Sequence, residues 1–265
     1  MCKVTAIVNQ KGGVGKTTTA LNLGYALSEK EKRVLLIDFD PQASLTAALG
    51  QNADGEPNIQ TLMANAIEEK STEENYIISI KNNLDLIPSS LELAGIEMTL
   101  VNVMSRENIL KIAIEEIKDK YDYILIDCSP SLGTLTINAL TASDSVIIPV
   151  TPEFLSAKGL GLLIKNIRKI KKRVNPAIEV DGILITMTNG RTNLSKAMIQ
   201  AIKDSTNIIE ENFGIKTKAF KTTIPISIKA GESILNKKSI IEYEPKNKVS
   251  LAYQEFAREW EEWKK

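Results

Sequence analysis

The sequence has 265 residues, 43% of them hydrophobic and 25% charged, which is the balance of an ordinary folded protein with a sizeable core. Its 33 basic and 33 acidic side chains cancel, so any attraction to nucleic acid or to an anionic membrane must come from a local patch. With only Cys2 and Cys128 and no histidine, we expect neither a disulfide framework nor a zinc centre. No apolar run approaches the roughly 18 residues of a membrane span and no secretory signal is present, so we expect a cytoplasmic protein.

The chain opens with an apolar run of β type at residues 4–8, followed by a glycine-rich loop at residues 9–18. A helical pattern comes next, in which Ala20, Leu23 and Leu27 share one face. In this order of strand, loop and helix, the amides of a tight turn and of a helix N-terminus surround an anion with partial positive charge. The sequence therefore predicts a phosphate-binding loop.

Residue types within the loop fit a nucleotide. Its three glycines would let the main chain approach the phosphates and adopt positive φ. Lys16 would reach the β- and γ-phosphates, and the Thr17 hydroxyl would hold Mg²⁺. Gln10 stands where the general pattern G-x-x-x-x-G-K-[ST] has its first glycine, and Lys11 is an additional lysine. The residues predicted to contact the nucleotide are Lys11, Gly12, Gly13, Val14, Gly15, Lys16, Thr17 and Thr18.

Two later apolar runs end in carboxylates. One leads to Asp38 and is followed by Asp40, and the other ends at Asp127. The carboxyl ends of parallel strands meet at the sheet edge where α/β proteins bind ligands. An aspartate delivered to that edge is typical of a Mg²⁺ site next to phosphates, so we assign this role to Asp127. Cys128 is interpreted as a small buried residue.

The remaining pattern alternates strands and helices. It predicts further strands at 84–88, 145–150, 182–187 and 221–225, and helices at 59–67, 106–120, from about 155 to 173, from the Asn193 region, and from 249 to 264. The helix at 106–120 is expected to bury Ile109, Ile112, Ala113 and Ile117. This alternation predicts an α/β fold: one domain, residues 1–265, with a mostly parallel twisted sheet flanked by helices on both faces.

Residues 165–173 include six lysines and arginines. At helical spacing Leu163, Ile167 and Ile170 would face the core, which leaves the cations in solvent. No aromatic side chains are interleaved with them, which argues against stacking on single-stranded nucleic acid. A solvated face is favoured over a nucleic-acid site.

The last helix carries Val249, Ala252, Phe256, Trp260 and Trp263 at helical spacing. An apolar face with two tryptophans raises the question of a membrane surface. Acidic residues outnumber basic ones on the polar face, whereas a helix drawn to anionic lipid should be basic. Packing against the sheet or a second subunit is therefore favoured.

The loop K-G-G-V-G-K-T-T resembles the deviant Walker A motif of the ParA/MinD family, a P-loop NTPase family that binds ATP with Mg²⁺. The run Asp-x-Asp-Pro-Gln from Asp38 resembles the switch I motif of that family. The resemblance implies that Lys11 reaches across a nucleotide-sandwich homodimer to the phosphates of the partner subunit. It also implies that Asp40 orients the attacking water and that Asp38 supports the same switch beside the metal, so the catalytic residues would be Lys11, Lys16 and Asp40 and the metal residues Thr17, Asp38 and Asp127.

Two later segments are similar to ParA/Soj proteins rather than to MinD. These are Leu-Ile-Thr-Met…Arg-Thr-Asn-Leu-Ser and Tyr-Glu-Pro-Lys-Asn-Lys. The resemblance implies partition of plasmid or chromosomal DNA, non-specific DNA binding in the ATP state, a nucleoid-associated location, and stimulation of hydrolysis by a ParB-like partner. The candidate DNA contacts are Arg191, Lys229, Lys246 and Lys248, while Ile226 stands where relatives carry an arginine.

Three alternatives stay open at this point. A MinD-like membrane switch would use the terminal tryptophans. A ParA-like positioner of protein cargo would share the ATPase and the DNA binding. An iron–sulfur reductase with the same loop would need a cysteine pair from each subunit, for which Cys2 is badly placed.

Overall fold

An eight-stranded sheet forms the centre of the computed structural model, which describes residues 2–54, 57–70, 76–190 and 193–262. The strand order is β3-β4-β2-β5-β1-β6-β7-β8, and every neighbouring pair is parallel except β3 and β4. The strands are β1 (Lys3–Ile7), β2 (Val34–Phe39), β3 (Ile78–Lys81), β4 (Leu84–Ile87), β5 (Tyr123–Cys128), β6 (Ser145–Val150), β7 (Glu179–Thr188) and β8 (Ala219–Pro225).

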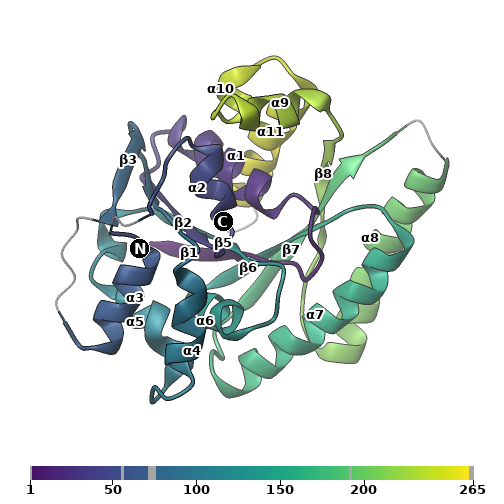
Figure 1. The fold of residues 1–265 in the computed structure, drawn as a ribbon. Coiled ribbons are helices and arrows are strands. Elements are labelled where there is room, and N and C mark those ends of the chain that lie inside the picture. The colour runs from purple at the N-terminus through teal and green to yellow at the C-terminus, as the bar shows by residue number, and fades with distance from the viewer. Residues whose placement is uncertain (1, 55–56, 71–75, 191–192, 263–265) are drawn as a thin grey trace.

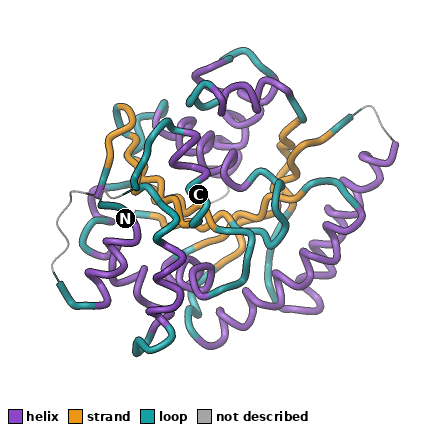
Figure 2. The backbone as a smooth tube through the Cα atoms, in the orientation of Figure 1, coloured by secondary structure: helices purple, strands orange, loops and turns teal. Residues whose placement is uncertain are grey.

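Helices cover both faces of this sheet, as Figures 1 and 2 show. One face carries α1 (Lys16–Ser28), α2 (Ser44–Ala48), α9 (Ile228–Leu235), α10 (Ile240–Tyr243) and α11 (Lys248–Glu262). The other carries α3 (Ile59–Ile67), α4 (Leu93–Leu100), α5 (Ile109–Glu115), α6 (Thr134–Ala142), α7 (Phe154–Arg173) and α8 (Asn193–Phe213). The predicted α/β fold is confirmed.

Two separate hydrophobic cores follow from this layering. In β2, Val34 and Leu36 belong to the core under α1, whereas Leu35 and Ile37 belong to the core under the opposite helices. Successive side chains of a strand point to opposite faces, so a strand covered on both sides must be apolar at every position. This requirement explains the continuous apolar runs of the sequence.

The helix predicted at 106–120 is present but shorter than predicted, and Ile109, Ala113 and Ile117 are buried as expected. The segment forms a 3₁₀ turn at Arg106–Asn108, then α5, then a second 3₁₀ turn at Lys118–Lys120. The Asn138 side chain of α6 fixes the first break, since it accepts from the Leu110 amide at 3.1 Å and donates to the Arg106 carbonyl at 2.9 Å. Ile112, expected inside, is exposed. The short antiparallel edge strand β3 was not predicted either.

The C-terminal helix α11 packs against the sheet, as predicted. Its Trp260 is 1% exposed and donates its indole N–H to Asp181 at 2.8 Å. The Lys3 ammonium lies 2.5 Å from the same carboxylate oxygen and 4.3 Å from the centroid of the Trp260 ring. Trp260 is therefore a core residue, and Trp263 lies outside the described residues. No helix within the described ranges is long and apolar enough to cross a membrane.

Removal of the Trp260 ring should strongly destabilise the protein. Trp260→Ala would leave a cavity and remove the hydrogen bond from the indole to Asp181, and we expect a loss of about 3–5 kcal/mol in the free energy of unfolding. Urea unfolding followed by circular dichroism measures this loss. Leu251→Ala, on the exposed side of the same helix, is the control and should change it by less than about 0.5 kcal/mol. Equal midpoints for the two variants would contradict the assignment of Trp260 to the core.

Candidate functional site

The glycine loop joins β1 to α1 at the carboxyl edge of the sheet, and its backbone is fixed from two sides. Asn9 donates to the Pro149 carbonyl at 2.6 Å and accepts from the Lys11 amide at 2.9 Å. The Thr186 hydroxyl donates to the Val14 carbonyl at 2.8 Å. These contacts tie the loop to the ends of β6 and β7, so its amides are held in place before any ligand binds.

Glycine is required at two of the three predicted positions. Gly13 has φ 72° and Gly15 has φ 85°, a region that side-chain-bearing residues rarely adopt. Gly12 does not have positive φ, which corrects that part of the prediction. Gly15 is the N-cap of α1 and brings no side chain to cap the helix. The first-turn amides of α1 are thus left for a ligand, as an anion site requires.

Lys16 starts α1 and is almost fully buried. Its ammonium folds back over the loop and donates to the Lys11 carbonyl at 3.4 Å. Burial lowers the pKa of Lys16, and the nearby carboxyl of Asp127, with Cys128 and Asp40, opposes that change. A phosphate at the loop would supply the anionic partner that this ammonium lacks.

Asp38 and Asp127 lie opposite each other on the neighbouring strands β2 and β5. Burial is the main cause that raises the pKa of Asp127 well above its usual value, and the charge of Asp38 adds to it. The Thr17 hydroxyl and the Lys16 ammonium are close enough to oppose this rise. Burial likewise raises the pKa of Asp38 to about 6, against the hydrogen bonds that this carboxylate receives. A cation bound between β2 and β5 would therefore stabilise both carboxylates in their charged form.

The surroundings of Asp127 fit Mg²⁺. Within the described ranges neither of its buried carboxylate oxygens has a partner in hydrogen-bonding geometry. An unpaired buried carboxylate is costly, and a cation removes that cost. The described residues contain no group of three or more Asp, Glu, His or Cys that could hold a metal by itself. Mg²⁺ suits such an incomplete site, because it takes one or two carboxylates and completes its shell with water and phosphate oxygens.

Asp38 is held in a hydrogen-bonded network that reaches the loop after β2. One carboxylate oxygen accepts from the Thr46 amide at 2.8 Å and from the Thr46 hydroxyl at 2.7 Å, and the other accepts from the Asp40 amide at 3.3 Å. The Thr46 hydroxyl accepts from the Ser89 amide at 2.9 Å, and the Ser89 hydroxyl donates to the Asp40 carbonyl at 2.8 Å. Asp38 thus anchors the loop that carries Asp40, while its part in metal binding stays a prediction.

Sequence reasoning missed Thr46 and Ser89. Thr46 lies in α2 and Ser89 follows β4, far apart in sequence, and neither belongs to a recognisable motif. They meet only because β4 pairs with β2. The network buries Asp40 almost completely, with one carboxylate oxygen accepting from the Gln42 amide at 3.0 Å. Asp40 is therefore positioned next to the glycine loop by contacts that the motif does not contain.

Lys11 differs from Lys16 in its surroundings. Its side chain is 41% exposed and forms an ion pair with Glu153, at the N-terminus of α7. The two lysines of the loop thus point to different partners: Lys16 toward the acidic strand ends and Lys11 toward the surface. This arrangement leaves Lys11 accessible to a second subunit. Its reach across a dimer stays a prediction.

An apolar cavity of about 290 Å³ opens beside the loop. Met187, Pro225 and Ile226 line it, together with Gly15 and Thr18 of the loop and first turn. Met187 has φ 52°, which is unusual for a residue with a side chain and is typical of a backbone held for function. In the sequence, Ile226 stands out only because relatives carry an arginine at this position. In the structure, its side chain forms part of the apolar lining of this cavity.

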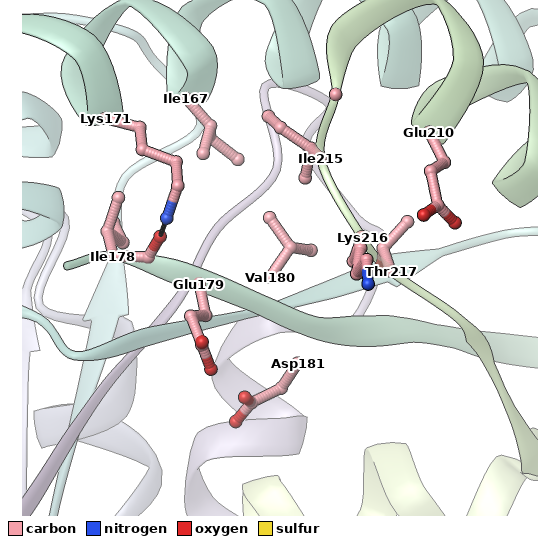
Figure 3. Close-up of a pocket in the computed structure, with 11 residues that line it drawn as sticks. Ile167, Lys171, Ile178, Glu179, Val180, Asp181, Glu210, Ile215, Lys216 and Thr217 are labelled. Carbon is pink, nitrogen blue, oxygen red and sulfur yellow. Dashed lines mark hydrogen bonds between the residues drawn. The ribbon is translucent and has the colours of Figure 1, made fainter. Parts of the chain in front are cut away.

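A larger cavity of about 630 Å³ lies elsewhere (Figure 3). It is lined by Ile167 and Lys171 of α7, by Val180 at the start of β7, and by Glu210 and Ile215 at the end of α8 and after it. The start of β7 is the opposite edge of the sheet from the glycine loop. This cavity is therefore separate from the phosphate site.

The candidate DNA contacts differ in how accessible their charges are. Lys246 and Lys248 are exposed at the start of α11. Lys229 of α9 forms an ion pair with Glu232 at 2.8 Å, which reduces its value as a free cation. Arg191 lies outside the described residues.

The pKa changes of the two strand-end carboxyls give a pH prediction for the protein without nucleotide. A carboxyl whose folded pKa lies above its unfolded value holds its proton longer when folded, so stability falls as pH rises between the two values. For Asp38 that interval runs from 3.8 to about 6. Urea midpoints should therefore drop as pH increases through this range.

Asp127→Asn provides the matched variant for this measurement. It removes one of the two buried carboxyls whose ionisation is unfavourable, so we expect its urea midpoint to fall less between pH 4 and pH 7 than that of the unaltered protein. If the urea midpoints of the two proteins fell equally with pH, ionisation of Asp127 would not destabilise the folded protein.

Comparison with known proteins agrees with this geometry. A family model described as an AAA domain matches residues 2–180. The sporulation initiation inhibitor protein Soj of Bacillus subtilis is 42% identical over 260 residues, which cover 98% of each chain.

Two solved structures are similar over the whole fold. Cobyrinic acid a,c-diamide synthase of Mycobacterium smegmatis, with a bound ATP analogue and magnesium, has a TM-score of 0.79 at 32% identity and covers 97% of this chain and 93% of its own. A putative plasmid partition protein of Borrelia burgdorferi bound to AMPPNP has a TM-score of 0.74 at 30% identity, covering 97% of this chain and 100% of its own. With these matches and the loop and strand ends described above, the chain belongs to the ParA/Soj family of P-loop ATPases.

Proposed function

We propose that this chain is a Mg²⁺-dependent ATPase that dimerises on ATP and partitions DNA. One observation carries the proposal: the Lys16 ammonium, the Thr17 hydroxyl and the Asp127 carboxylate, which accepts no hydrogen bond of good geometry from the described residues, meet beside a helix N-terminus that has no side-chain cap. These are the groups that a triphosphate with its metal ion requires. The name of one similar protein, a putative plasmid partition protein, supports the choice of DNA as cargo.

Each part of the nucleotide has a counterpart in the site. The amides between Lys11 and Thr18 and the Lys16 ammonium would bind the phosphates, and the apolar cavity at Met187 would take the base. Thr17 and Asp127 would hold Mg²⁺, with Asp38 behind them. Bound magnesium neutralises the charge that develops on the phosphate oxygens during transfer.

Asp40 is the residue that we assign to the attacking water. It lies near enough to Lys16 for the two charges to interact, and the Thr46 and Ser89 network holds its loop. In its ionised form it accepts a hydrogen bond from water and aligns that water with the terminal phosphate. Because the reaction depends mainly on this positioning, slow switch-type turnover is expected until a partner improves the alignment.

Lys11 would complete the site of a second subunit. It has to leave Glu153 to do so, and an exposed ion pair of this kind is worth only about 0.2–1 kcal/mol. A triphosphate in the opposite subunit offers the ammonium several charges and so outcompetes one carboxylate. The ammonium then neutralises transition-state charge, as an arginine finger does.

DNA binding would follow from dimer formation, which joins two half-patches of lysine and arginine. We assign Lys246 and Lys248 to this surface, together with Lys229 and Arg191. A ParB-like partner would stimulate hydrolysis and release the DNA, which fits a cytoplasmic, nucleoid-associated protein. A positioner of protein cargo would use the same site, whereas the burial of Trp260 weighs against a membrane switch.

Dimer formation tests the central claim. We expect Lys11→Ala, in an Asp40→Ala background that blocks turnover, to bind ATP but remain monomeric, because the charge donated across the interface is gone. Light scattering behind a sizing column reads the mass with Mg-ATP and with Mg-ADP. Lys30→Ala is the matched control, since Lys30 is 40% exposed and is paired with a glutamate, as Lys11 is. A monomeric Asp40→Ala parent under saturating Mg-ATP would refute the proposal.

Co-sedimentation with DNA tests the cargo. Binding should require ATP and should fall steeply as salt increases, because neutralised phosphates release counterions. Replacing Lys246 and Lys248 together with alanine should weaken binding at every DNA sequence and flatten the salt dependence by about two units of slope for each subunit of the dimer. Binding to liposomes alone, under the same nucleotides, would instead support the membrane alternative.

A further inference from the structure

The cavity of about 630 Å³ at the far end of β7 from the glycine loop has the size of a ligand site (Figure 3). Small-molecule sites in proteins occupy roughly 300–1,000 Å³. Four of the side chains that line this cavity belong to the hydrophobic core and are no more than 5% exposed: Ile167, Ile178, Val180 and Ile215. The cavity therefore has apolar walls that the fold holds in place.

The path of the chain leaves this space open. Helix α8 ends at Phe213, and Gly214, with φ 64°, turns the chain back toward the sheet. Pairing between β7 and β8 begins at Ile183 and Ala219, well inside β7. The connection at 214–218 thus runs beside the start of β7 outside the ladder, and the cavity lies between them.

Two of the carboxylates at this cavity belong to the other face of β7. Successive residues of a strand point to opposite sides. Val180 lies in the core under α7 and α8, whereas Glu179 and Asp181 lie on the other side of the strand in Figure 3. The Asp181 carboxylate is engaged there by Trp260 and Lys3. Neither carboxylate therefore faces a molecule inside the cavity.

Lysines are the main charged groups on the cavity side. The Lys171 ammonium of α7 donates to the Ile178 carbonyl (Figure 3), and within the described ranges it is not paired with a carboxylate. An ammonium has three N–H donors, so Lys171 can also donate to a ligand. Lys216 and Glu210 line the cavity as exposed residues, which leaves the cavity side with more positive than negative charge.

The end of α7 adds to this positive charge. Residues 165–173 contain six lysines and arginines, of which Lys169, Lys172 and Arg173 are exposed. A group of like charges beside an opening attracts ions of the opposite sign and speeds their encounter. Positive charge next to apolar walls fits an anion with an apolar body.

We propose that this cavity binds an apolar molecule that carries a single carboxylate. The apolar body would pack on Ile167, Val180 and Ile215, and the carboxylate would accept a charge-assisted hydrogen bond from Lys171. A cationic molecule of the same shape would be repelled by Lys171. The inference does not rest on the proposed ATPase function, because the cavity and the glycine loop lie at opposite ends of β7.

Three naphthalene probes test the charge of the ligand. 2-Naphthoate, 2-naphthylmethanol and 2-naphthylmethylamine share one apolar ring system and carry a negative, a neutral and a positive group. Isothermal titration calorimetry measures the binding of each probe to the full chain with saturating Mg-ADP, so that nucleotide occupies the site at the glycine loop. We expect 2-naphthoate to bind about tenfold more tightly than the alcohol, because a charge-assisted hydrogen bond is stronger than a neutral one.

The amine should bind most weakly of the three. Absence of saturable 2-naphthoate binding would overturn the proposal, as would binding of the alcohol or the amine that equals or exceeds that of 2-naphthoate.

Lys171→Gln and Lys172→Gln form a matched pair on α7. Each removes one positive charge, but Lys171 lines the cavity whereas Lys172 is exposed on the helix. Lys171→Gln should weaken 2-naphthoate binding about tenfold and leave binding of the alcohol unchanged. Lys172→Gln should weaken 2-naphthoate binding by at most about twofold, because solvent and salt screen an exposed charge. Equal losses in the two variants would assign the anion to the basic surface in general and overturn the proposal.

Filling the cavity locates the apolar body of the ligand. Val180→Phe places a larger side chain in the space and should abolish binding of both 2-naphthoate and the alcohol. Thr217→Phe fills the same cavity from the connection without regular structure, so it serves as the test if Val180→Phe does not fold. Circular dichroism identifies folded variants, and unchanged binding by a folded filling variant would refute the site. If Mg-ADP itself did not bind, the proposed function would be wrong, while the Lys171 and Lys172 variants would still decide this inference.

Discussion

Two carboxylates buried side by side at one sheet edge are the constraint on which the site depends. Asp38 and Asp127 occupy facing positions on parallel neighbours, and burial raises the pKa of both. The protein relieves only one of them, since Thr46 donates twice to Asp38 whereas Asp127 has no partner in hydrogen-bonding geometry among the described residues. The buried carboxylate of Asp127 is costly without a cation, so a metal ion that arrives with its nucleotide would bind there favourably.

The strand order determines which groups meet around these two carboxylates. Because β5 lies between β2 and β1, the acidic ends of β2 and β5 and the glycine loop after β1 meet at one place. Lys16 is buried toward the carboxylates, and Lys11, five residues earlier, is turned to the surface. One loop thus offers one ammonium to its own site and one to the surface, which is the arrangement that the proposed dimer would use.

The same network connects the site to more distant surfaces. Ser89, which follows β4, holds the Asp40 carbonyl, and α4 begins shortly after it. Glu97 on α4 then contacts the start of α6, which continues from the Asp127 segment. Both acidic loops therefore contact the stretch of chain that runs from Ser89 into α4.

Motif and periodicity in the sequence determined the fold class, the glycine loop and the strand-end aspartates. Those features are local: a buried parallel strand must be apolar throughout, and a phosphate loop requires glycines and a lysine at fixed spacing. The break in the predicted helix at 106–120 came from Asn138, whose hydrogen bonds to Arg106 and Leu110 compete with the helix.

Contacts between residues far apart in the chain were decided only by the tertiary structure. No local pattern shows that Thr46 and Ser89 hold the Asp40 loop, or that Trp260 donates to Asp181. In the sequence, Ile226 replaces an arginine that relatives carry, whereas in the structure it lines the apolar cavity beside the glycine loop. Spacing along the chain predicts which groups an element presents, whereas the pairing of strands decides which of those groups meet.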